Sequence, residues 1–80
     1  MSIENLSPLA HHIYLVIANA SSGYLAVWTI AEMVNAPIPA NFCGSGEWSE
    51  TDTAMKELVD GGFIEELPDL HCRYRIKKAA

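Results

Sequence analysis

The sequence predicts a small α+β domain in which three helices are followed by a C-terminal two-stranded β-hairpin. Two observations lead to this prediction: apolar residues recur at helical spacing in three separate stretches, and polar and apolar residues alternate near the end of the chain. The chain has 80 residues, half of them apolar, which is enough for one compact core without a metal or a disulfide scaffold. We therefore expect a single domain spanning residues 1–80.

The first helix is expected to follow Ser7, because serine is a good N-cap and Pro8 then takes the first helical position, where its missing N–H costs nothing. Small residues at 21–23 end this helix. Its apolar stripe recurs at helical spacing and consists of Leu9, Ile13, Val16, Ile17 and Ala20.

A second helix is predicted over residues 26–35, after a very short extended segment at Tyr24 and Leu25. Pro37 prevents its continuation, because proline lacks the N–H of the helical hydrogen bond. The following residues, 36–48, contain two prolines and two glycines and are predicted to form a long loop.

Three large apolar side chains of this loop, Ile38, Phe42 and Trp48, allow two interpretations. The first is that they tuck back beneath the loop as a satellite cluster, with Trp48 acting as a hydrophobic staple before the third helix. The second is that they form a surface for a binding partner. The sequence favours the first interpretation, and Phe42 and Trp48 are the candidate binding residues under the second.

The third helix is expected to begin after Ser49, which forms a capping box with Asp52, and to end at Gly61 in a left-handed conformation. Its predicted inward residues are Thr51, Ala54, Met55, Leu58 and Val59. Its predicted outward residues are Glu50, Thr53, Glu57 and Asp60. This outward face is mostly carboxylate.

The hairpin is predicted from two short runs, 63–67 and 71–77, which are separated by a turn at 68–70. In the second run, apolar positions alternate with Arg73, Arg75 and Lys77, which then share one face of the strand. Carboxylates on the first strand, Glu65 and Glu66, are expected to lie opposite these cations and to form cross-strand pairs.

Charge is distributed unevenly along the chain. All ten acidic residues precede position 72, against one lysine, so the first 72 residues carry 1 minus 10, or −9, and the remainder carries +4. The acidic part of the chain attracts basic surfaces and repels phosphate backbones, except where the basic residues after position 72 are exposed.

Composition also excludes several classes of protein. The longest apolar run, residues 13–18, is far shorter than the ~20 residues of a spanning helix, so we expect no membrane contact. Two cysteines are too few for a disulfide framework, and the absence of a secretory signal favours a reducing, cytoplasmic location, where a disulfide between Cys43 and Cys72 is disfavoured.

No catalytic or cofactor motif is present. The histidines and cysteines, His11, His12, His71, Cys43 and Cys72, lack the spacing of a zinc site. We therefore expect no metal, no cofactor and no enzymatic activity.

Three segments of the chain resemble the winged helix-turn-helix family. The run IAEMV at 30–34 is similar to its second helix, KELVDGGFIEE at 56–66 to its junction between third helix and wing, and YRI at 74–76 to its returning strand. In that family the third helix commonly enters the major groove of double-stranded DNA. The resemblance implies a DNA-binding transcriptional regulator that acts as a homodimer through its first helix, with phosphate contacts from Lys56, Arg73, Arg75 and Lys77.

The chain departs from the family in two ways: the outward face of its third helix is acidic, and about thirteen residues replace a short turn before that helix. These departures favour a different function, a non-enzymatic protein-binding module whose partner carries a basic surface. By analogy, such a module is suited to inhibiting a nucleic-acid-binding protein, as virus-encoded anti-defence proteins of the anti-CRISPR kind do. The predicted binding residues are Glu50, Thr53, Glu57, Asp60, Phe42 and Trp48.

Overall fold

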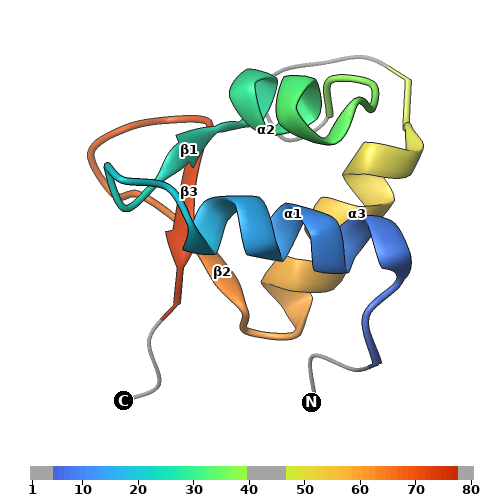
Figure 1. Cartoon of the computed structure of the whole chain (residues 1–80), viewed down its shortest axis with the longest axis horizontal. Helices are drawn as coiled ribbons and strands as arrows, with labels where there is room; N and C mark the ends of the chain where they lie inside the picture. Colours follow the sequence, from blue (N-terminus) through green and yellow to red (C-terminus); the bar gives the residue numbers. More distant parts are fainter. Residues whose placement is uncertain (1–4, 40–46, 78–80) are drawn as a thin grey trace.

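The computed structural model describes residues 5–39 and 47–77 and shows three helices and a small antiparallel sheet (Figure 1). The elements, in chain order, are α1 (Pro8–Ala18), β1 (Leu25–Ala26), α2 (Val27–Val34), α3 (Glu50–Asp60), β2 (Ile64–Glu66) and β3 (Arg73–Ile76). Both α1 and α3 start where their capping residues predict. None of the helices in the described ranges is long and apolar enough to cross a membrane.

The sheet has three strands, one more than the predicted hairpin, because part of the short extended segment expected at Tyr24 and Leu25 joins it. The strands are arranged in the order β1-β3-β2, and both pairings are antiparallel. The third strand, β1, adds to the free edge of β3, where Leu25 pairs with Tyr74 and Ala26 with Arg73. A strand of two residues is too short to show alternation in the sequence, and only the exposed edge of β3 gives it hydrogen-bond partners.

The N-terminal caps follow the predicted chemistry. The Ser7 hydroxyl accepts a hydrogen bond from the Ala10 N–H at 3.3 Å, and Pro8 occupies the first turn of α1. At α3 both halves of the capping box form: the Ser49 hydroxyl accepts from the Asp52 N–H, and the Asp52 carboxylate accepts from the Ser49 N–H at 2.8 Å. Asp52 is fully buried as a result.

The end of α3 differs from the prediction. Gly61 keeps a right-handed conformation with φ of −79°, and the left-handed residue is the next one, Gly62, with φ of +79°. Glycine is needed at position 61 for a different reason: a Cβ there would lie 2.8 Å from the Phe63 ring. The second glycine of the pair therefore supplies the reversal, and the first allows the close approach of Phe63.

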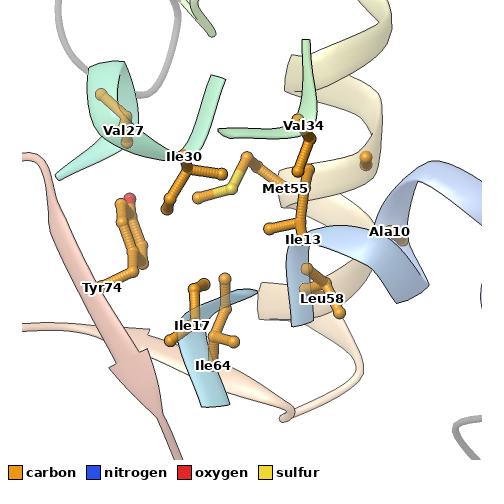
Figure 2. Packing of buried hydrophobic residues seen from close by; sticks show 11 residues of the cluster. Ala10, Ile13, Ile17, Val27, Ile30, Val34, Met55, Leu58, Ile64 and Tyr74 are labelled. Carbon is orange, nitrogen blue, oxygen red and sulfur yellow. The ribbon is translucent and has the colours of Figure 1, made fainter. Parts of the chain in front are cut away.

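All three helices and the sheet contribute to one hydrophobic core (Figure 2). Its buried members are Ala10, Ile13, Ile17, Val27, Ile30, Val34, Ala54, Met55, Leu58, Ile64 and Tyr74. Met55 lies between the α1 and α2 side chains in Figure 2 and is fully buried, as predicted for the inward face of α3. Val59, also predicted to face inward, is 37% exposed, because the buried arc of α3 ends at Met55 and Leu58.

Candidate protein-interaction face

The outward face of α3 keeps three of its four predicted residues in contact with solvent. Glu50, Thr53 and Asp60 are exposed, whereas Glu57, on the turn between Thr53 and Asp60, is half-buried. Phe42, predicted to join this face from the loop, lies outside the described residues.

Trp48 contacts this face through Thr53. Its indole N–H donates a hydrogen bond of 2.6 Å to the Thr53 hydroxyl, while 55% of the residue stays exposed. Ile38 is exposed to a similar extent, at 57%. The predicted satellite cluster is therefore wrong for these two residues, whereas Pro39, next to Ile38, is buried.

Glu57 has a structural role that the sequence pattern did not indicate. Its carboxylate accepts hydrogen bonds from the Ser7 N–H at 2.7 Å and from the Ser7 hydroxyl at 3.0 Å. These two bonds join the middle of α3 to the start of α1, 50 residues away in the sequence. Glu57 therefore directs its carboxylate to Ser7 and is less exposed than predicted.

The other charges on α3 are not equivalent. Asp60 forms an ion pair with Lys56 across one turn, at 2.5 Å, with both side chains more than half exposed. Glu50 and Glu47 are exposed and form no ion pair within the part of the chain that the structure describes. Negative charge is thus concentrated at the N-terminal end of α3, on either side of Trp48. We call Trp48, Thr53, Glu47 and Glu50 the Trp48 patch.

Glu47 was not among the predicted binding residues. The only sequence signal for it is its position directly before Trp48, which is not informative until the indole is known to be exposed. Glu50 also lies in the first turn of α3, where a carboxylate stabilises the helix by interacting with the positive end of its dipole.

The basic residues of the hairpin mostly contact other parts of the protein. The predicted cross-strand pairing is confirmed for Arg75, whose guanidinium lies 3.4 Å from the Glu65 carboxylate. Arg73 instead stacks over the Trp28 ring, 5.0 Å from its centroid, and donates a hydrogen bond to the His71 carbonyl. Lys77 is exposed at the end of β3.

Glu66, the second carboxylate predicted to pair with these cations, faces the hairpin backbone. It accepts a hydrogen bond of 3.0 Å from the Cys72 N–H, and its register partner on β3 is Tyr74. Burial, together with the nearby negative charge of Glu66, raises the pKa of the Tyr74 hydroxyl above its ordinary value.

Cys72 is joined in a disulfide, contrary to the prediction that the cysteines stay reduced. The only other cysteine in the sequence, Cys43, lies outside the described residues. The prediction rested on an inferred reducing compartment, which cysteine count alone cannot establish for a chain that has one possible pair. Among residues 5–39 and 47–77, no three His, Cys, Asp or Glu side chains are grouped closely enough to hold a metal ion.

No protein-family profile, curated protein or solved structure matches this chain.

Proposed function

We propose that this chain is a non-enzymatic protein-binding module that docks through the Trp48 patch onto a basic surface of a partner protein. One observation carries the proposal: an indole that is 55% exposed is oriented by a hydrogen bond to Thr53, and two exposed glutamates, Glu47 and Glu50, lie within two residues of it in the chain. Tryptophan is enriched among the residues that dominate binding energy, and an oriented side chain loses less entropy on binding.

The charge around this anchor indicates the chemistry of the partner. A carboxylate-flanked indole on a chain of net charge −5 attracts lysine and arginine side chains and also accepts a cation over its ring. Nucleic-acid-binding grooves are surfaces of this kind. An inhibitor that occupies such a groove, as in the analogy with anti-defence proteins, is the form of this function that we favour.

An NMR titration of the labelled protein with an arginine-rich peptide tests the chemistry directly. We expect the Trp48 indole N–H and the Thr53 and Glu50 amides to shift together, and Trp48→Ala to weaken binding at least ten-fold. Shifts confined to other faces would contradict the proposal. Met33→Ala is the matched control for the anchor, because Met33 is 52% exposed on α2.

A second pair of variants separates specific charge from total charge. Glu50→Lys and Glu32→Lys change the net charge equally, but only Glu50 belongs to the Trp48 patch, since Glu32 is exposed on α2. We expect Glu50→Lys to weaken peptide binding more than Glu32→Lys does. Equal effects would reduce the interaction to nonspecific attraction.

DNA binding is the second candidate function. It is supported by the alternation of Arg73, Arg75 and Lys77 along β3 and by the winged-helix resemblance, with which the element order helix, strand, helix, helix, strand, strand agrees. We rank it lower because Arg73, Arg75 and Lys56 all have partners within the protein. Retardation of random duplex DNA at about 50 mM salt, lost in Arg75→Ala, would reverse this ranking.

The cytoplasmic location predicted from the sequence remains a proposal. The disulfide at Cys72 counts against it, because disulfides persist mainly in oxidising compartments.

A further inference from the structure

An open groove lies at the end of α1, next to β3 (Figure 1). It has a volume of about 600 Å³, which is within the ~300–1,000 Å³ of ligand sites. Its apolar wall consists of Ile17, Ala18, Tyr24, Leu67 and Ile76. None of these residues belongs to the Trp48 patch, so the groove is a separate surface.

The groove exists because β1 covers only part of the β3 edge. Pairing with β1 reaches only as far as Tyr74, and the same register, continued, would place Gly23 opposite Ile76. The chain turns away before this position, because Gly23 has φ of +86° and donates its N–H to the Ala20 carbonyl at 3.1 Å. The edge of β3 is therefore open beside Ile76.

The main-chain groups of Ile76 point into this opening. Alternate residues of an antiparallel strand direct their N–H and C=O groups to opposite edges. The Lys77 N–H donates to the Phe63 carbonyl at 2.9 Å, so Lys77 faces β2 and its neighbour Ile76 faces the other edge. Within residues 5–39 and 47–77, the N–H and C=O of Ile76 have no hydrogen-bond partner on that edge. Ile76 therefore presents one donor and one acceptor to the groove, as an unpaired strand edge does.

We propose that the groove binds an extended segment of a partner protein, which adds to β3 beside Ile76 in the position that β1 leaves open. An extended peptide complements this edge, because one of its residues exchanges both hydrogen bonds with Ile76. The paired part of the segment is short, since β1 already occupies the edge at Tyr74.

The walls of the groove specify the side chains of this segment. Its residue opposite Ile76 shares a face of the sheet with Ile76, which packs against the core cluster that contains Ile17. An apolar side chain therefore fits at this position. The neighbouring residues of the segment point to the opposite face, where Glu65 is part of the groove wall.

The electrostatics of the groove favour basic residues beside the apolar one. The last residue of α1, Ala18, lines the groove, and no basic side chain in the last turn offsets the negative end of the helix dipole. Arg75 also lines the groove, but its charge is offset by Glu65 at 3.4 Å, and the whole chain carries −5. The occupant is therefore an extended segment in which an apolar residue lies between two basic residues.

An NMR titration of the full chain with the blocked peptide Ac-KVK-NH₂ tests the proposal. Because only one residue pairs, we expect a dissociation constant on the order of 1 mM. The Ile76 and Gly23 amide signals should shift, that of Ile76 downfield as its N–H gains a hydrogen bond. The same peptide with an N-methylated valine is the matched control, since it keeps both charges but lacks the N–H that the Ile76 carbonyl accepts. It should bind about ten-fold more weakly.

Ala18→Arg and His12→Arg form the matched pair of protein variants. Both residues are exposed on α1 and both changes add one positive charge, but only Ala18 lines the groove. Ala18→Arg should abolish peptide binding, because the new side chain fills the groove and repels the basic residues of the peptide. His12→Arg should bind the peptide as the wild type does.

Four results would overturn the proposal. The first is the absence of shifts at about 10 mM peptide, which is about ten times the expected dissociation constant. The second is equal binding of the N-methylated peptide, or equal effects of the two variants. The third is a set of shifts confined to the Trp48 patch, which would assign the peptide to that surface. The fourth is an Ile76 signal that shifts with protein concentration alone, which would assign the groove to a second copy of the chain.

Discussion

Glu57→Gln should destabilise the fold, although Glu57 was predicted to be a surface binding residue. Its carboxylate accepts hydrogen bonds from the Ser7 N–H at 2.7 Å and the Ser7 hydroxyl at 3.0 Å. Glutamine keeps one acceptor oxygen and places an NH₂ group where the second acceptor was. The Ser7 hydroxyl must then accept from this NH₂ group instead of donating, and both bonds are to a neutral group.

The expected loss is about 2 kcal/mol of unfolding free energy, because hydrogen bonds to charged groups contribute ~1.5–3 kcal/mol each when they are partly shielded from water. In a domain of this size, 1 kcal/mol shifts Tm by ~4–8 °C, so Tm should fall by about 8–16 °C. Urea unfolding followed by circular dichroism measures the free energy, since a chain of 80 residues is expected to unfold in one step.

Asp60→Asn is the matched control on the same helix, because its exposed ion pair with Lys56 is worth only ~0.3–0.5 kcal/mol. A double-mutant cycle between Glu57→Gln and Ser7→Ala should show a coupling of about 1 kcal/mol. If Glu57→Gln cost no more than Asp60→Asn, or if the coupling were zero, the link between α3 and α1 would not stabilise the fold. Glu57 is therefore a poor choice for testing docking, because weaker binding by its variants could reflect lost stability. The variants of Glu50 and Trp48 leave the bond between Glu57 and Ser7 in place.

Three further predictions concern stability. The pKa of Tyr74 is raised in the folded state, so the contribution of Tyr74 to stability is complete below about pH 10 and is lost as the pH rises through the folded pKa. The unfolding free energy should therefore fall in alkali, and Tyr74→Phe should flatten that fall. Equal pH profiles for the two proteins would contradict this. Cys72→Ser should lower the unfolding free energy by about 2–4 kcal/mol, the typical contribution of a disulfide, and a reducing agent should lower the unfolding free energy of the wild type but not that of the variant. Gly62→Ala should cost about 1 kcal/mol because φ is +79° there, and a thermal melt equal to that of the wild type would refute this.

Local chemistry allowed the sequence to determine the helices and their starting points. Ser7 with Pro8, and Ser49 with Asp52, satisfy N–H groups within a few residues of themselves, so their effect is the same in any tertiary setting. The inward faces of α1 and α3 follow from spacing alone, because Ile13 and Met55 each lie on the most apolar side of their own helix.

Only the tertiary structure decided which outward side chains are available for binding. Glu57 is bonded to Ser7, Arg73 lies on Trp28, and these pairs join residues far apart in the chain, whose meeting depends on how the helices and sheet pack. The same holds for β1, which exists as a strand only because β3 presents an unpaired edge. Sequence periodicity tells which face of an element turns away from the core, and it contains no information about what another element places against that face.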